Sequence, residues 1–280
     1  MIIDIHTHIF PDKVASNAIK KLSAASGLAP FSNGTLNGLL ESMGKSNVDI
    51  SCILPVATDE NQVEHINNFA ADLNEKYRGK IISFAGLHPN YTNYKREIRR
   101  IKSLGFKGIK VHPLYQNTDI YDIRYLRIFA YAAELDIIIL THAGLDIGFP
   151  GISRCSPKMI RKVIREIGDF KFVLAHLGGW EEWEDVLAEL ADTNVYIDTA
   201  FSIGKKSLAK NPDEHISLMK DELAQKIIHA FSCDKVLFGS DSPWTDQKES
   251  IEAIKKLSFS KDGQRKILGD NAAGILGLDF

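Results

Sequence analysis

The chain has 280 residues, of which 44% are hydrophobic and 25% are charged, and its formal net charge at pH 7 is −2. This balance is typical of a globular protein and excludes a fibrous or disordered chain. Because basic residues are not in excess and no apolar run reaches the length of a membrane helix, we expect neither a nucleic-acid nor a membrane partner. Three scattered cysteines and an N-terminus without an apolar leader predict a reduced, cytoplasmic protein.

Eight short runs of apolar and β-branched residues predict strands that are buried on both faces. In chain order they are Ile2–Ile5, Ser51–Val56, Ile81–Leu87, Gly108–Val111, Ile137–Leu140, Phe172–Ala175, Val195–Ile197 and Val236–Phe238. Charged amphipathic stretches between the strands predict helices. These are Tyr94–Leu104, Tyr121–Leu135, Pro157–Ile167, Trp180–Ala191, Asp213–Phe231 and Asp246–Leu257, and the long Ile9–Asn47 connection is expected to add helical turns.

Strands that alternate with helices in a chain of this length predict an α/β fold, a (β/α)8 TIM barrel that forms one domain over residues 1–280. A doubly wound open sheet is the alternative, but it usually carries a glycine-rich phosphate loop, and the sequence has none. Active sites of the barrel lie at the C-terminal mouth of the strands. We therefore look for chemistry in the residues that follow each predicted strand.

Six of the nine histidines lie at or just after the ends of predicted strands. They are His6, His8, His88, His112, His142 and His176. His6 and His8 are two residues apart, so a strand presents both imidazoles on one face, where they can bind one divalent metal ion. An acidic donor, Asp241, follows the last predicted strand. The other three, His65, His215 and His229, lie in or beside predicted helices, where we expect packing or surface roles.

As an ordered set, five motifs resemble the amidohydrolase superfamily, and in particular the amidohydrolase-related branch that contains aminocarboxymuconate-semialdehyde decarboxylase. The motifs are Ile3–Pro11, Phe106–Pro113, Thr141-His142, Ala175–Gly179 and Phe238–Pro243, so the resemblance covers nearly the whole chain. It implies a TIM barrel with a catalytic divalent metal, usually zinc, although manganese also fits and the number of ions is one or two. It also implies a small-molecule substrate and, as a further expectation, a homodimer.

The resemblance also implies roles for individual residues. His6, His8 and His142 would be metal ligands. Asp241 would be a ligand, the general base, or both. His176 would act in catalysis by binding or orienting a metal-bound water, or would bind a second ion. Such an ion activates water at neutral pH, and a neighbouring carboxylate can accept its proton.

Lys110 lies on the fourth predicted strand, two residues before His112. Some members of the superfamily carry a carbamylated lysine on this strand that bridges two metals. An unmodified lysine would instead bind a carboxylate or oxyanion of the substrate, which is the role that we favour here.

Further candidates for substrate binding follow the other strands. His88 and His112 can each donate a hydrogen bond to a substrate or fix a loop beside the site. Arg154 can hold a carboxylate, with a solvated loop arginine as the alternative. Trp180 and Trp244, together with Phe201, can wall an apolar pocket. Asp198, at the end of the seventh predicted strand, is placed to support a ligating histidine.

Several functions fit this set of residues. The first is a metal-dependent hydrolase of an amide, lactone or related small carbonyl or carboxylate compound. The alternative is a non-oxidative decarboxylase of an unsaturated or aromatic carboxylic acid. A TatD-type phosphoesterase or nuclease shares Gly86–Pro89 and Asp241–Pro243, but Lys110 stands where those enzymes carry a glutamate. A barrel that binds ligands without turnover is less favoured, because no expected metal ligand is missing.

Overall fold

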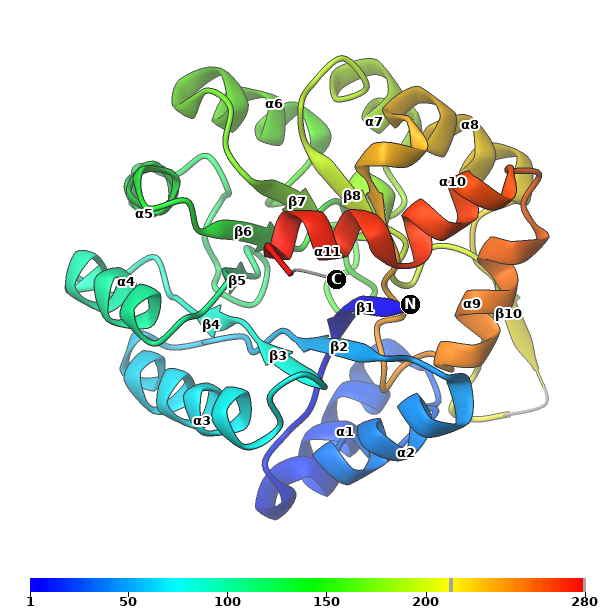
Figure 1. Cartoon of the computed structure of the whole chain (residues 1–280), viewed down its shortest axis with the longest axis horizontal. Coiled ribbons are helices and arrows are strands. Elements are labelled where there is room, and N and C mark those ends of the chain that lie inside the picture. The colour runs from blue at the N-terminus through cyan, green and yellow to red at the C-terminus, as the bar shows by residue number, and fades with distance from the viewer. Residues whose placement is uncertain (212–213, 279–280) are drawn as a thin grey trace. The chain divides into compact units, whose positions relative to one another are not determined.

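The computed structural model describes residues 1–211 and 214–278, which fall into two compact units. Unit 1 comprises Met1–Ile53 and Asp198–Phe280, and unit 2 comprises Leu54–Ile197. Both units are built from short strands and helices (Figure 1). The prediction of one domain over residues 1–280 stays a prediction.

Unit 1 contains the first and last strands of the chain. Its elements are β1 (Ile3–Thr7), α1 (Asp12–Ser26), α2 (Leu36–Ser46), β2 (Ile50–Ile53), β9 (Lys205–Ser207), β10 (His215–Ser217), α8 (Asp221–Phe231), β11 (Val236–Leu237), α9 (Gln247–Lys256), α10 (Lys261–Arg265), a π-helical turn (Lys266–Asp270) and α11 (Asn271–Leu276). Strand β1 pairs in parallel with β2. On its other side the Ile5 amide donates to the Phe238 carbonyl (2.9 Å), and the Asp241 amide donates to the His6 carbonyl (2.8 Å). The segment that follows β11 is thereby held against the end of β1.

Unit 2 is a ladder of parallel strands with helices between them. It contains α3 (Val63–Lys76), β3 (Ile81–Ser83), β4 (Ala85–Gly86), α4 (Tyr94–Ser103), β5 (Gly108–Val111), α5 (Ile123–Glu134), β6 (Ile138–Thr141), α6 (Pro157–Ile167), β7 (Phe172–Leu174), α7 (Trp183–Glu189) and the start of β8 (Tyr196–Asp198). Strands β4 to β8 pair in parallel in chain order. The carboxyl ends of β6 and β7 therefore lie side by side. His142 follows β6 directly, and His176 is the second residue after β7.

Local signals in the sequence explain several helix boundaries. The Ser156 side chain accepts from the Met159 amide, and Pro157 is the first residue of α6. Gly105, with φ +82°, follows the end of α4 in the left-handed conformation that glycine adopts readily. The expected helical turns between Ile9 and Asn47 are α1 and α2. Among the described residues, no helix is long and apolar enough to cross a membrane.

Three expected elements differ from the structure. The helix predicted over Asp213–Phe231 begins only at Asp221, because Ile216 and its two neighbours pair antiparallel with β9; Asp213 itself lies outside the described residues. The helix predicted from Trp180 begins at Trp183, because the Trp180 backbone pairs with the segment after β6. The strand predicted over Ile81–Leu87 is split into β3 and β4.

Candidate metal centre and histidine cluster

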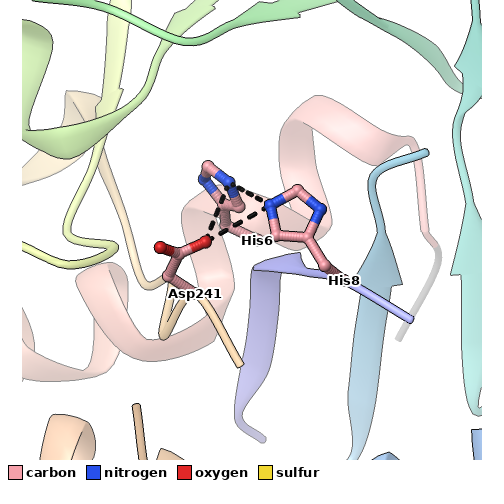
Figure 2. Close-up of side chains that lie close together, drawn as sticks. All are labelled: His6, His8 and Asp241. Atoms are coloured by element: carbon pink, nitrogen blue, oxygen red, sulfur yellow. Dashed lines mark hydrogen bonds and ion pairs between the residues drawn. The ribbon is translucent and has the colours of Figure 1, made fainter. Parts of the chain in front are cut away.

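Strand β1 and the segment after β11 bring three metal-binding side chains together in unit 1 (Figure 2). The Nε2 atoms of His6 and His8 are 3.2 Å apart. The Oδ1 atom of Asp241 lies 3.5 Å from His6 Nε2 and 3.3 Å from His8 Nε2. His6 is buried, and His8 and Asp241 are slightly exposed. The structure therefore brings together the three side chains that the sequence suggests as metal ligands.

The spacing of these three atoms fits a divalent metal ion. Ligands at bonds of about 2.1 Å in a tetrahedron are separated from one another by about 3.4 Å. The three measured separations, 3.2, 3.3 and 3.5 Å, lie around that value. Two imidazoles and one carboxylate are a donor set that suits first-row divalent metals. We therefore assign His6, His8 and Asp241 as a candidate site for a divalent ion.

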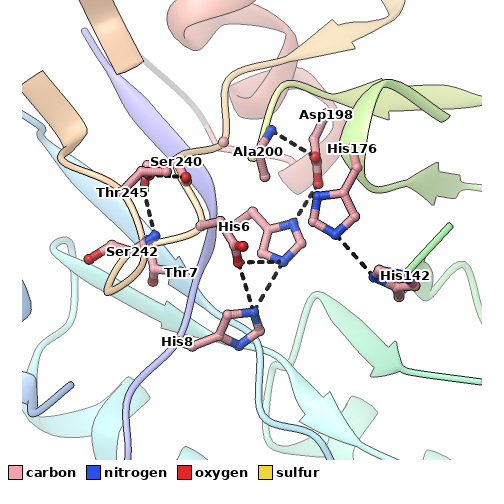
Figure 3. Close-up of polar contacts among 12 residues, drawn as sticks. His6, Thr7, His8, His142, His176, Asp198, Ala200, Ser240, Ser242 and Thr245 are labelled. Carbon is pink, nitrogen blue, oxygen red and sulfur yellow. Dashed lines mark hydrogen bonds and ion pairs between the residues drawn. The ribbon is translucent and has the colours of Figure 1, made fainter. Parts of the chain in front are cut away.

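A buried aspartate fixes the orientation of His6. The Nδ1 atom of His6 lies 2.8 Å from Asp198 Oδ2, and the Ala200 amide donates to Asp198 Oδ1 at 3.0 Å (Figure 3). Because a carboxylate only accepts, the His6 proton resides on Nδ1, and Nε2 presents its lone pair toward His8 and Asp241. This contact is the support that the sequence predicts for Asp198.

A second buried aspartate, Asp4, ties β1 to the loop that carries Asp241. Its carboxylate accepts from the Ser240 amide (2.9 Å), the Ser240 hydroxyl (2.6 Å) and Gln247 Nε2 (2.8 Å). Burial raises the pKa of Asp4 to about 6, although the Ser240 and Gln247 hydrogen bonds oppose that rise. Sequence reasoning missed this network, because Gln247 lies 243 residues away in the chain.

The residue directly before Ser240, Gly239, has to be small. A Cβ atom on Gly239 would lie 2.9 Å from the His6 Cβ and 3.2 Å from the Ala200 Cβ. Asp241 itself adopts φ +68°, a left-handed conformation that is uncommon for aspartate. Close packing and local backbone strain are thus concentrated at the residues that place the candidate ligands.

Unit 2 holds a cluster of three histidines and one aspartate. The rings of His112 and His142 stack at 4.2 Å. His176 Nε2 lies 3.1 Å from His142 Nδ1 (Figure 3). Asp146 Oδ2 lies 3.4 Å from His112 Nε2. His112, His142 and Asp146 also have the spacing of a possible cation site. Sequence reasoning missed Asp146, although an acidic residue four positions after His142 was the available signal.

Two imidazoles of this cluster, those of His112 and His142, are neutral at pH 7. Burial lowers the pKa of His112 to about 4 and that of His142 to about 3. His142 Nε2 lies 2.8 Å from the Leu145 carbonyl, which only accepts, so the His142 proton is on Nε2 and its Nδ1 lone pair faces His176. Burial alone would raise the pKa of Asp146, but its hydrogen bond with His112 and the two nearby imidazoles lower it, so the carboxylate is ionised.

Lys110 is 1% exposed and lies on β5, two residues before His112. Its positive charge adds to the burial that lowers the pKa of both His112 and His142, which places the ammonium close to the cluster. The expectation that Lys110 and His112 face one site is consistent with this arrangement. Its role toward a substrate stays a prediction.

The other predicted substrate-binding residues lie in different surroundings. His88 Nδ1 is 3.7 Å from Glu60 Oε2, and burial lowers the pKa of this imidazole. Arg154 is partly exposed and donates to the side chains of Asp119 (2.8 Å) and Asn117 (2.6 Å). Neither set of contacts includes a member of the histidine cluster. The substrate roles of His88 and Arg154 stay predictions.

The two predicted tryptophans belong to segments that carry candidate site residues. The Trp180 amide donates to the Ala143 carbonyl at 2.9 Å, so this segment is paired with the residues directly after His142. Trp244 lies three residues after Asp241, and its carbonyl accepts from Lys206 Nζ at 2.6 Å. Both side chains are half-buried. Their contacts with a substrate stay predictions.

Comparison with known proteins places this geometry in a family. The family model described as amidohydrolase matches residues 3–278. No curated protein shows significant sequence similarity to the chain. Among solved structures, an uncharacterized TIM-barrel protein from Bordetella bronchiseptica is 17% identical with a TM-score of 0.73, and the match covers 99% of this chain and 98% of that one.

Two decarboxylases are also similar over their full length. 2,6-Dihydroxybenzoate decarboxylase from Rhizobium is 14% identical with a TM-score of 0.70, and the match covers 100% of this chain and 99% of that one. 5-Carboxyvanillate decarboxylase from Novosphingobium aromaticivorans, solved with manganese and 4-hydroxy-3-methoxy-5-nitrobenzoic acid, is 13% identical with a TM-score of 0.71, and the match covers 99% of this chain and 96% of that one.

Because the family model spans nearly all of its length, the chain belongs to the amidohydrolase family. This assignment identifies it as an enzyme and confirms the family expected from the histidine and aspartate motifs. The full-length similarity to TIM-barrel structures confirms the predicted (β/α)8 fold class.

Proposed function

We propose that this enzyme is a metal-dependent, non-oxidative decarboxylase of an aromatic or unsaturated carboxylic acid. The convergence of His6 Nε2, His8 Nε2 and Asp241 Oδ1 is the observation that carries the proposal. The similarity of the whole chain to two decarboxylases of aromatic acids, one of them with manganese, favours this reaction. Hydrolysis, the first expectation from the sequence, has less support.

The metal would be a divalent ion, with manganese or zinc as the candidates. His6, His8 and Asp241 would hold it, because their three ligand atoms have the separations that such an ion needs. The role of His142 as a further ligand is taken from the family resemblance and stays a prediction. The same holds for His176, which would bind or orient the metal-bound water or bind a second ion. When bound, the ion would supply positive charge to polarise the substrate oxygens.

Decarboxylation breaks the bond between the carboxyl carbon and the adjacent carbon, and the electron pair stays on that adjacent carbon, which then takes a proton. A carboxylate has two oxygens, so Asp241 can bind the ion through Oδ1 and exchange a proton with the substrate through the other oxygen. Asp198 keeps the His6 lone pair on Nε2, and Asp4 holds the loop of Asp241 in place. Each residue thus contributes binding, orientation or a proton position.

The test is a direct comparison of the two reactions. Enzyme loaded with manganese or zinc is incubated with 2,6-dihydroxybenzoate, 5-carboxyvanillate and a panel of other aromatic and unsaturated acids, and CO2 release is followed by mass spectrometry. A parallel panel of lactones and amides is assayed for ring opening or amine release. We expect CO2 from at least one acid, and none from a His8→Ala variant. Turnover of a lactone or amide without CO2 release from any acid would assign the enzyme to the hydrolases instead.

A further inference from the structure

A buried lysine that the sequence analysis did not single out lies beside the candidate metal centre. Lys206 is the central residue of β9 and is 6% exposed, whereas its neighbour Lys205 on the same strand is exposed. Alternation along a strand places adjacent side chains on opposite faces, which explains why one lysine is solvated and the other is enclosed. The sequence alone does not reveal which of the two is buried.

The ammonium of Lys206 contacts the segment that follows Asp241 and the segment that follows Asp198. Its Nζ donates to the carbonyl of Trp244 at 2.6 Å and lies 5.6 Å from the centre of the Phe201 ring. Trp244 comes three residues after the candidate ligand Asp241. Phe201 comes three residues after Asp198, which orients His6. The position of this cation is therefore tied to the same two loops that position the candidate metal ligands.

This buried cation lacks a direct counter-charge. In the part of the chain that the structure describes, no carboxylate forms an ion pair with Lys206, and only one of its three N–H bonds has a hydrogen-bond acceptor. Burial lowers the pKa of Lys206 to about 7, and the more distant charges of Asp241, Glu249 and Asp246 only partly oppose that effect. A buried charge without a partner is costly, and an anionic ligand with hydrogen-bond acceptors would remove that cost.

We propose that Lys206 binds the carboxylate of the substrate beside the candidate metal centre. This inference rests on the proposed function and names the residue that recognises the acid group. The ammonium would donate its two remaining N–H bonds to the carboxylate oxygens and keep its bond to the Trp244 carbonyl. The Phe201 ring beside Nζ favours the charged form of the lysine through a cation–π contact. Lys206 is thus a specificity residue for acids over their neutral analogues.

The first experiment needs no mutation. Metal-loaded enzyme is reductively methylated with limiting reagent, with and without benzoate, and the modification at each lysine is quantified by peptide mass mapping. We expect benzoate to slow methylation of Lys206 several-fold and to leave that of the exposed Lys205 unchanged. Benzamide, which has the same shape without the charge, should protect neither residue. Equal modification of Lys206 with and without benzoate would overturn the proposal.

The second experiment measures binding in matched variants. Dissociation constants for benzoate and benzamide are measured by calorimetry for the wild type, Lys206→Met, Lys206→Arg and the control Lys205→Met. Loss of a charge-assisted hydrogen bond should weaken benzoate binding at least about tenfold in Lys206→Met, with partial recovery in Lys206→Arg and no change in Lys205→Met. Wild-type affinity for benzoate in Lys206→Met, or no benzoate binding to the wild type, would contradict the inference.

The two proposals fail separately. If benzoate protects Lys206 but no acid releases CO2, the carboxylate site stands and the decarboxylase assignment falls. If an acid releases CO2 but Lys206→Met retains the KM of the wild type for it, the decarboxylase assignment stands and another residue binds the carboxylate.

Discussion

Replacing Asp198 with asparagine tests how the chain prepares His6 for a metal. The two oxygens of the Asp198 carboxylate accept from different donors, Oδ2 from His6 Nδ1 at 2.8 Å and Oδ1 from the Ala200 amide at 3.0 Å. An asparagine of the same shape has only one acceptor oxygen, so it can satisfy one of these two donors but not both. The Asp198→Asn variant therefore either releases the His6 ring or leaves the Ala200 amide without its partner.

The magnitude follows from the kind of contact that is lost. Removing the residue that orients a ligating histidine typically lowers metal affinity 10- to 100-fold, or by about 1.4 to 2.7 kcal/mol. Because His6 is 1% exposed and Asp198 is completely buried, solvent cannot replace the missing acceptor, and we expect a loss within that range. The fold should persist, since the side-chain volume is unchanged.

The assay is competition for zinc or manganese between the protein and a coloured chelator, with circular dichroism as the check on folding. The exposed pair of Asp192 and Arg161 provides the control, because Asp192→Asn removes a similar charge at a solvated site. An affinity within twofold of the wild type in a folded Asp198→Asn variant would refute the view that this aspartate prepares His6 for the ion.

Three further changes have defined outcomes. Gly239→Ala places a methyl group 2.9 Å from the His6 Cβ, so we expect weaker metal binding in the chelator assay and a lower Tm, and unchanged values in both would contradict the packing described above. Gly144→Ala puts an alanine at φ +83° and within 2.3 Å of the Trp180 backbone, and urea unfolding should show a loss of at least about 2 kcal/mol. Lys206 has a folded pKa of about 7 and an unfolded pKa of 10.5, so the unfolded state binds more protons between these values and stability rises with pH. The free energy of unfolding of the wild type, relative to Lys206→Met, should therefore increase by about 2 kcal/mol from pH 7 to pH 9, and a flat difference would show that Lys206 titrates normally.

The strand ends were predictable because the information is local. Apolar runs mark the strands, parallel strands bring their carboxyl ends to the same side, and a residue spacing of two puts His6 and His8 on one face. The same reasoning indicates that Asp198 supports a ligating histidine. In the structure that histidine is His6, whose Nδ1 lies 2.8 Å from Asp198 Oδ2. The amidohydrolase motifs then supply the family, which the full-length model match confirms.

The parts that escaped prediction depend on pairing between distant segments. The residues before α8 form a strand because they pair with the backbone of β9. The sequence around Ile216 does not by itself show which segment it pairs with. Burial of Lys206 follows from this hairpin and from Trp244, 38 residues away. Asp146 was missed because only the fold brings it to His112, 34 positions earlier in the chain.

Metal content per chain tests the central claim that His6, His8 and Asp241 hold a divalent ion. His8 is the best residue to change, because its side chain is 20% exposed and its loss should leave the core intact. The wild type and His8→Ala are purified side by side without chelator and measured by elemental analysis. We expect about one divalent ion per wild-type chain and far less in the variant. Equal metal content in both proteins, or none in a wild type that has been supplied with manganese and zinc, would contradict it.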